Sequence, residues 1–397
     1  MKHLVAVLAL ACTAIAASAS AQNWSRSWAV APQTPPAANS DRPLPDLKDR
    51  TIRQVVRLST GGPRLRVRLS NEMSDQPIRI GAVHVAIADA DGRIVPGSDR
   101  PVRFDGEDSV AIPAHAPMLS EPIALPVKPL QRIAISIHLP DGAAQPTLHQ
   151  HAAATAWIAA GNQAGAVTLS GANTFGQRLI IAGVDVESAK LRRTLVAFGD
   201  SITDGAAATN DADTRWPDLV AERLQRAKLD MGVANLGIGG NRVLEDGNGL
   251  NALARFDRDA LSVPGVSHVI ILEGVNDIGA AWRDKAAIRP SADDLIDAYR
   301  QLIARGHDRG VKVILATILP YKGAGYWSEW GEGVRTEVNA WIRTNREADG
   351  FVDFDKAIRD PADPLRMAKP YDIGDALHPN DAGFKAMAAA VDLKLLR

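Results

Sequence analysis

The second half of the chain alternates short apolar runs with amphipathic segments, and this alternation limits the possible folds more than any other feature. We expect strands at 194–199, 231–236, 267–273, 311–318 and 351–354, and helices near 214–229, 291–309, 333–348 and 380–395. Strands that alternate with helices predict a parallel sheet with helices on both faces. Ligands of such sheets bind beyond the carboxyl ends of the strands, so chemistry is expected in the residues that follow each strand.

Polar residues with complementary chemistry follow these predicted strands. Ser201 comes soon after the apolar run 195–198, in a Gly-Asp-Ser turn. Asp375 and His378 are three residues apart, about the reach that a carboxylate needs to hold an imidazole in one tautomer. A glycine-rich block ending at Gly240 and a block containing Asn276 follow two further strands. A nucleophile, a base, its orienting acid and donors for an oxyanion are the groups that acyl transfer requires.

These blocks resemble those of the GDSL, or SGNH, hydrolase family of esterases and lipases. Four blocks occur in the family's order, and the resemblance covers about residues 194–397. They are Gly199-Asp200-Ser201-Ile202, with Ile where Leu is usual, then Gly240, then Gly274-Val275-Asn276-Asp277, and finally Asp375-Ala376-Leu377-His378. The α/β-hydrolase family fits less well, because residue 203 is Thr and the GxSxG elbow is missing.

The resemblance implies a three-layer, flavodoxin-like α/β/α domain built on a five-stranded parallel sheet. It also implies that Ser201 is the nucleophile, His378 the base and Asp375 its partner. The oxyanion hole would consist of the backbone N–H groups of Ser201 and Gly240 and the side chain of Asn276. We expect no cofactor and no metal, since the sequence has no HExxH motif and no clear cluster of metal ligands. Asp277 is interpreted as structural.

The first half has the period-two pattern of β-strands. Leu65, Val67 and Leu69 alternate with arginines, and similar short strands separated by Asp-Gly and Gly-Gly turns continue to about residue 187. Such a series favours an all-β sandwich or jelly roll. We therefore expect a β-sandwich accessory domain at 49–187 and the hydrolase domain at 190–397. A Pro- and Ala-rich stretch at 22–48 is expected to be an extended arm, because proline is excluded from helix interiors.

The N-terminus predicts export. Residues 1–21 have a short basic start, an apolar run and an Ala-Ser-Ala cleavage site, which together indicate a signal peptide and a periplasmic or secreted protein. A buried first helix and a lipoprotein anchored at Cys12, the chain's one cysteine, are the alternatives. No other run approaches membrane-spanning length. The formal net charge of −1 argues against a nucleic-acid partner or an anionic membrane surface.

Loop residues of the second half are candidates for substrate binding. Arg242, Trp282, Tyr321 and Trp327 lie in loops between the blocks, where aromatic rings could stack on sugars, line an acyl pocket, or pack against the β domain. In the first half, His149 and His151 could form a metal pair, but with no third ligand in view we interpret them as ordinary polar side chains.

The leading hypothesis is a secreted serine esterase that acts on short-chain or O-acetyl esters of carbohydrate, either small molecules or acylated polysaccharide. Two alternatives stay open. One is a lipase or thioesterase for longer acyl chains, and the other is a carbohydrate-binding protein whose hydrolase half is inactive. The sequence gives no indication of oligomeric state.

Overall fold

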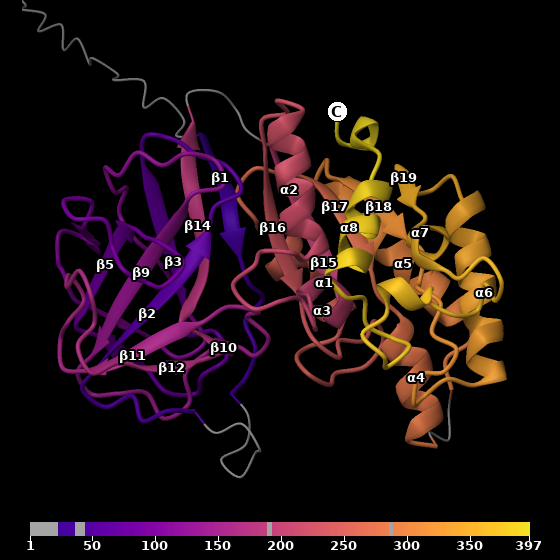
Figure 1. Ribbon diagram of the computed structural model, residues 1–397, viewed down its shortest axis with the longest axis horizontal. Coiled ribbons are helices and arrows are strands. Elements are labelled where there is room, and N and C mark those ends of the chain that lie inside the picture. The colour runs from indigo at the N-terminus through magenta and orange to yellow at the C-terminus, as the bar shows by residue number, and fades with distance from the viewer. Residues whose placement is uncertain (1–22, 36–43, 189–192, 286–288) are drawn as a thin grey trace, which may run out of the picture.

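The computed structural model describes residues 23–35, 44–188, 193–285 and 289–397. The expected signal peptide at 1–21 and part of the expected arm lie outside the described residues. From residue 23 to 188 the structure is built of antiparallel sheets, here called the β region, and from residue 193 onward it alternates strands and helices, here called the catalytic region (Figure 1).

The β region contains two main sheets that enclose one apolar core, which makes it a sandwich. The four-stranded sheet has the order β1-β14-β3-β8, and the six-stranded sheet has the order β12-β11-β2-β9-β5-β6. Two further pairs, β4 with β7 and β10 with β13, complete the region. The strands are β1 (Asn23–Ala29), β2 (Arg50–Arg57), β3 (Leu65–Ser70), β4 (Ile78–Ile80), β5 (Ala82–Ile87), β6 (Arg100–Pro101), β7 (Val110–Ile112), β8 (Pro117–Leu119), β9 (Arg132–Leu139), β10 (Leu148–His149), β11 (Ala156–Ala160), β12 (Asn173–Phe175), β13 (Arg178–Leu179) and β14 (Ile181–Ser188).

The start of the expected extended arm is instead a regular strand. β1 pairs with β14 along its length, so residues 23–29 of the expected extended arm form an edge strand of the four-stranded sheet. The reason is that one strand serves both regions. Trp28 belongs to the core of the β region, whereas Ala29 belongs to the core of the catalytic region. The N–H of Arg26 donates across the boundary to the carbonyl of Pro264.

The catalytic region has a five-stranded parallel sheet with the order β16-β15-β17-β18-β19, covered by helices (Figure 1). This architecture confirms the predicted α/β fold. The strands are β15 (Arg193–Gly199), β16 (Met231–Gly237), β17 (Val266–Leu272), β18 (Lys312–Ala316) and β19 (Gly350–Val352). Each lies within two residues of its predicted bounds at its start and its end.

Long helices occur where the sequence predicted them, and short helices were missed. The long helices are α2 (Trp216–Arg226), α5 (Ala292–Asp308), α6 (Glu329–Thr344) and α8 (Asp381–Ala390). The short ones are α1 (Ser201–Asp204), α3 (Ala252–Phe256), α4 (Val275–Arg283), α7 (Phe354–Ile358), the π-helix η1 (Asp257–Leu261) and the 3₁₀ helices η2 (Lys369–Tyr371) and η3 (Leu393–Leu396). Helix α2 packs beside α8, and α5 packs beside α6. Two of the short helices, α1 and α4, begin at the GDSL-type blocks.

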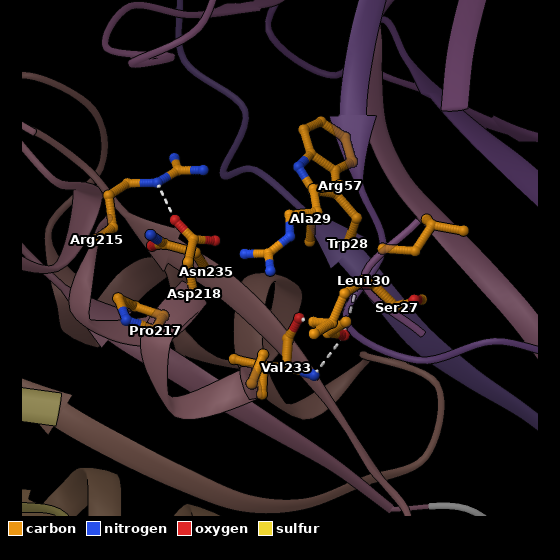
Figure 2. A pocket seen from close by; sticks show the side chains of 13 residues that line it. Ser27, Trp28, Ala29, Arg57, Leu130, Arg215, Pro217, Asp218, Val233 and Asn235 are labelled. Carbon is orange, nitrogen blue, oxygen red and sulfur yellow. Dashed lines mark hydrogen bonds and ion pairs between the residues drawn. The ribbon is translucent and has the colours of Figure 1, made fainter. Parts of the chain in front are cut away.

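The two regions pack directly on each other. Figure 2 shows this boundary, where Ser27, Arg57 and Leu130 of the β region face Pro217 and Val233 of the catalytic region. The hydroxyl of Ser59 accepts a hydrogen bond from the Val233 N–H at 2.8 Å, and Arg57 forms an ion pair with Glu222 of α2 at 2.8 Å. The cavity left between them is about 20 Å³, room for about one water molecule.

Candidate active site

The predicted nucleophile lies at a sharp turn from strand to helix. β15 ends at Gly199, and Ser201 is the first residue of the four-residue helix α1. Asp200 caps that helix, since its side chain accepts a hydrogen bond from the Ile202 N–H at 2.9 Å. A side chain at Gly199 would place its Cβ 2.5 Å from the carbonyl oxygen of Leu272, so the turn requires glycine. The turn leaves the Ser201 side chain at the carboxyl edge of the sheet.

Ser201, His378 and Asp375 form one hydrogen-bonded chain. The Ser201 hydroxyl lies 2.9 Å from Nε2 of His378, and Nδ1 of His378 lies 2.7 Å from Oδ2 of Asp375. An ionised carboxylate only accepts hydrogen bonds, so Nδ1 carries a proton and Nε2 is left as the acceptor for the serine hydroxyl. The structure therefore brings together the three residues that the sequence proposed as nucleophile, base and orienting acid.

The Asp375 carboxylate is held in its ionised form. Burial would raise its pKa, but hydrogen bonds from the His378 N–H, the imidazole and the Leu377 N–H outweigh burial and lower it. The tight turn that makes these bonds possible has Ala376 in the left-handed region at φ +59°. Helix α8 begins at Asp381, just beyond the turn, and is capped by Asn380, so the helix anchors the end of the turn.

The expected oxyanion donors lie on neighbouring segments. Gly240 has a φ of +75°, and a Cβ there would lie 2.6 Å from Nδ2 of Asn248, so the position requires glycine. Nδ2 of Asn276 donates to the carbonyl of Asn241 at 3.0 Å, which ties the start of α4 to the residue after Gly240. Within the described part of the chain, the N–H groups of Ser201 and Gly240 donate to no other protein group. Both N–H groups are thus available to a ligand.

Tyr326 and Asp277 orient these donors. The Tyr326 hydroxyl donates to Oδ1 of Asn276 at 3.3 Å, which leaves the amide nitrogen of Asn276 as the donating end. Burial raises the pKa of Tyr326, so its hydroxyl keeps the proton that it donates. The Asp277 carboxylate accepts from the N–H groups of Val243 and Leu244, as expected for a structural residue, and so fixes the loop after Gly240. Burial raises the pKa of Asp277 to about 6.

A buried arginine links the strand ends beneath the site. Arg255 is fully buried and donates to the carbonyls of Gly199 and Leu236. Gly199 is the last residue of β15, and Leu236 is the residue before the last of β16. It also contacts Glu273, which follows β17, at 3.3 Å. Burial and the nearby Asp200 raise the pKa of Glu273 well above its ordinary value, although Arg255 opposes this. Burial likewise raises the pKa of Asp200 to about 7.

A histidine from the β region also supports the site. Nε2 of His149 lies 2.8 Å from Oδ1 of Asp204, the last residue of α1, and Nδ1 lies 2.9 Å from the carbonyl of Ala31. Oδ2 of Asp204 accepts from the Gly239 N–H at 3.0 Å. Both side chains are 2% exposed. His149 therefore supports the helix that carries Ser201 and, through Asp204, the loop that presents Gly240.

The four candidate substrate-binding residues have different environments. Trp282, near the end of α4, is exposed and has the guanidinium of Arg289 stacked 4.7 Å from its ring centre. Arg242 is partly exposed and pairs with Glu245 at 3.1 Å, and Trp327 is half-buried. Tyr321 has no exposed surface, so the expectation that it binds substrate directly is wrong. Its ring packs against Tyr326, 6.0 Å between centres, and so supports the residue that contacts Asn276.

Several site residues were missed from the sequence. Tyr326 lies in the same loop as the aromatic candidates that were named, so its type and position were a usable signal. His149 was noted, but it was interpreted as an ordinary polar side chain, with a metal pair as the alternative. Arg255 gave no signal, because its partners come from three different strand ends.

No group of three or more His, Cys, Asp or Glu side chains within residues 23–35, 44–188, 193–285 and 289–397 is arranged to hold a metal ion. None of the helices in these ranges is both long enough and apolar enough to cross a membrane.

Comparisons with known proteins give the family. Residues 197–386 match the GDSL-like Lipase/Acylhydrolase family. No curated protein matched the chain. Similar solved structures include an acetyl xylan esterase (21% identity, 50% of this chain and 96% of that chain, TM-score 0.39). A carbohydrate acetylesterase from Sinorhizobium meliloti is 17% identical (51% and 98%, TM-score 0.40), and a GDSL-like lipase from Bacteroides thetaiotaomicron is 19% identical (51% and 88%, TM-score 0.39). The C-terminal half of this chain is therefore a GDSL-like lipase/acylhydrolase domain, a carboxylic ester hydrolase that follows an N-terminal region of antiparallel β-sheets.

Proposed function

We propose that this protein is a serine esterase that removes short acyl groups, foremost acetyl groups, from carbohydrate through an acyl-enzyme. The observation that carries the proposal is the chain of hydrogen bonds from Ser201 through His378 to Asp375, at 2.9 and 2.7 Å. Both distances lie within the range at which a base can take a proton from a nucleophile and be oriented by an acid.

In the first half of the cycle, the Ser201 oxygen attacks the carbonyl carbon of the ester while Nε2 of His378 takes the serine proton. The negative charge that develops on the carbonyl oxygen is stabilised by the N–H groups of Ser201 and Gly240 and by Nδ2 of Asn276. The carbon–oxygen bond to the alcohol then breaks, and His378 gives its proton to the departing alcohol oxygen. Asp375 stays ionised and stabilises the imidazolium.

In the second half, water replaces the alcohol. Nε2 of His378 takes a proton from the water as its oxygen attacks the acyl carbon of the acyl-enzyme. The bond to the Ser201 oxygen then breaks, that oxygen recovers the proton from His378, and a carboxylic acid leaves. The cycle ends with the three residues in their starting protonation states.

The openness of the site supports a bulky, hydrated alcohol. The side chains of Asp375 and His378 are 41% and 20% exposed, so the triad lies at the surface. A polymer-borne ester can reach such a site without being threaded into the protein, and only a small acyl group needs to enter. This is the physical basis on which we favour esters of carbohydrate.

A lipase or thioesterase activity is the second candidate, and one residue favours it. Ile373 is 46% exposed and lies two residues before Asp375, with its N–H directed to the carbonyl of His378 at 3.3 Å. An exposed aliphatic side chain beside the triad could contact a longer acyl chain. We further propose export, on the basis of the signal-like residues 1–21.

Both candidates are separated by one set of assays. Purified protein would be given nitrophenyl acetate, butyrate and octanoate and acetylated xylan, beside Ser201→Ala and a control, Ser170→Ala, in an exposed loop of the β region. Turnover of acetate and xylan that depends on Ser201 is expected, with octanoate poorly used. A rate that rises with chain length would favour the lipase. Full activity of Ser201→Ala would refute the mechanism. Binding of xylan without turnover of any ester would favour a carbohydrate-binding protein whose hydrolase half is inactive.

A further inference from the structure

A second cavity lies where the β region meets the loop after β16. Its volume is about 280 Å³, close to the lower limit of about 300 Å³ for small-molecule sites. We call it the interregion cavity. Its walls are Gln33, Thr34, Pro35, Gln150 and His151 from the β region and Gly239, Gly247, Asn248 and Gly249 from the catalytic region.

The interregion cavity adjoins the expected oxyanion hole. Gly239, in its wall, directly precedes Gly240, and a Cβ at Gly240 would lie 2.6 Å from Nδ2 of Asn248, which is also in the wall. A Cβ at Gly239 would lie 3.2 Å from Nδ1 of His151 on the opposite side. A ligand in the cavity would thus contact the loop that stabilises the reacting carbonyl oxygen.

The wall is fixed by hydrogen bonds that cross the boundary. Oε1 of Gln33 accepts from the Gln150 N–H at 2.9 Å, and Nε2 of Gln33 donates to the carbonyl of Asn248 at 3.5 Å. Gln33 itself is 5% exposed. The Gln33 amide and the backbones of Gln150 and Asn248 are therefore held in place before any ligand arrives, which lowers the entropy cost of binding.

The chemistry of the lining favours a neutral, hydroxyl-rich ligand. Oε1 of Gln150 is buried and accepts no hydrogen bond from the described part of the chain, so a rotation of this side chain toward a ligand O–H donor would sacrifice no existing bond of that oxygen. Amide side chains such as those of Gln150 and Asn248 both donate and accept, as hydroxyl groups do. Among the described residues of the lining there is no Asp, Glu, Lys or Arg, which disfavours an ion, and Pro35 is the one aliphatic side chain, which disfavours an acyl chain.

We propose that the interregion cavity is a subsite for the sugar ring that carries the ester, on the alcohol side of the scissile bond. This inference rests on the proposed function and sharpens it, since it assigns the β region a direct part in choosing the substrate. A bound sugar would direct its acyl group past Gly240 toward Ser201. Substrates without a sugar ring would not use the subsite.

The test compares two substrates in each variant. Gln150→Ala and Asn248→Ala remove amides from opposite walls, and Gln163→Ala, in a β-region loop bonded to Thr51, is the matched control. The quantity measured is kcat/KM for an acetylated xylo-oligosaccharide divided by kcat/KM for nitrophenyl acetate. We expect this ratio to fall about tenfold in each wall variant, the loss of one or two hydrogen bonds, and to stay unchanged in the control.

An unchanged ratio in both wall variants would overturn the subsite, whether the two rates fall together or not at all. The proposed function is checked separately, because it fails if Ser201→Ala matches the wild-type protein or if the wild-type protein turns over no ester. In that event the subsite is tested by calorimetric binding of unacetylated xylo-oligosaccharide to the full chain. Weaker binding in Gln150→Ala than in Gln163→Ala supports the subsite, and equal or absent binding overturns it.

Discussion

Each region buries more than one arginine, and the most deeply buried of each, Arg53 in the β region and Arg255 in the catalytic region, have different partners. Arg53, on β2, is 1% exposed and donates to backbone carbonyls of surrounding loops, among them Ala166, and to the hydroxyl of Ser136. Burial lowers its pKa, with only Asp99 opposing. Arg255 is equally buried but contacts the carboxylates of Glu273 and Asp259 as well as carbonyls at strand ends.

The difference in partners corresponds to a difference in role: one arginine only stabilises the fold, and the other also positions the proposed active site. The loops that Arg53 organises carry no residue of the proposed reaction, so its role is to satisfy backbone groups within the β region. The strand ends that Arg255 joins carry Ser201 and Gly240, and Glu273 precedes the block that holds Asn276. The same buried cation therefore stabilises a fold in one region and positions a catalytic site in the other.

The largest effect is expected when each arginine is replaced. Arg255→Met leaves Glu273 and the strand-end carbonyls without their buried donor and leaves Asp259 with Arg258 as its only partner cation among the described residues, a change that costs about 3–5 kcal/mol of unfolding free energy and also displaces the strand ends. Arg53→Met should also lower stability, because it leaves carbonyls unpaired, but kcat per folded molecule should stay near the wild-type value. Thermal unfolding and kcat on nitrophenyl acetate, measured on both variants, check this. Equal loss of kcat in both would remove the distinction between the regions.

The next effect concerns the oxyanion hole, which belongs to the catalytic region alone. Asn276→Ala should lower kcat by about 10²–10³-fold with little change in KM, since the amide acts mainly on the developing charge. Tyr326→Phe should lower kcat less, because it frees the Asn276 amide to rotate without removing it. Asn345→Ala, at the end of α6, is the control and should leave kcat unchanged. A wild-type kcat in Asn276→Ala would exclude this residue from the hole.

The order of elements and the catalytic groups were predictable because they depend on local pattern. Leu65, Val67 and Leu69 are fully buried in β3, as their alternation predicted. The predicted positions of Ser201 and His378 followed from short blocks at strand ends. Loops have no such period, so the sequence could not decide that Tyr321 is buried while Tyr326 reaches Asn276.

Contacts between segments that are distant in the sequence also could not be predicted from the local residue pattern. The alternation of His149 and His151 suggested two side chains on one strand face, but β10 ends at His149. The strand pattern stops there, and the two rings serve different purposes. His149 contacts Asp204 and His151 lines the interregion cavity. Which partner each ring meets depends on how the two regions pack, and this is absent from local sequence.

The contact of His149 with Asp204 predicts that one β-region residue affects catalysis and another does not. His149→Ala should lower kcat about tenfold and change KM little, because Asp204 loses a partner while holding the Gly239 N–H. His149→Gln keeps a donor and should recover part of the rate. His84 makes a hydrogen bond with Asp99 of the same 2.8 Å length, but within the β region, so His84→Ala should leave kcat unchanged. Equal kcat values in the two alanine variants would show that the β region does not support the site.

The smallest effect is a pH dependence of stability that arises in the catalytic region. The pKa of Glu273 is raised by burial and by Asp200, so between the ordinary glutamate pKa and the raised one the folded protein binds a proton that the unfolded chain has released. Stability therefore falls as pH rises through this window. His268, whose pKa burial lowers to about 4, gives the opposite slope only below its ordinary pKa of about 6.5. Above about pH 6.5 stability still falls with rising pH because of Glu273. Asp200, whose folded pKa is about 7, contributes in the same direction.

Glu273→Gln isolates this contribution, because the amide cannot ionise and still accepts a hydrogen bond from Arg255. The fall in unfolding temperature as pH rises above about 6.5 should be smaller in this variant than in the wild-type protein. Glu347→Gln, which alters an exposed pair with Arg300, should leave the wild-type slope intact. If Glu273→Gln keeps the full slope, the carboxyl is already ionised in the folded protein, and Arg255 then neutralises a charge instead of contacting a neutral acid.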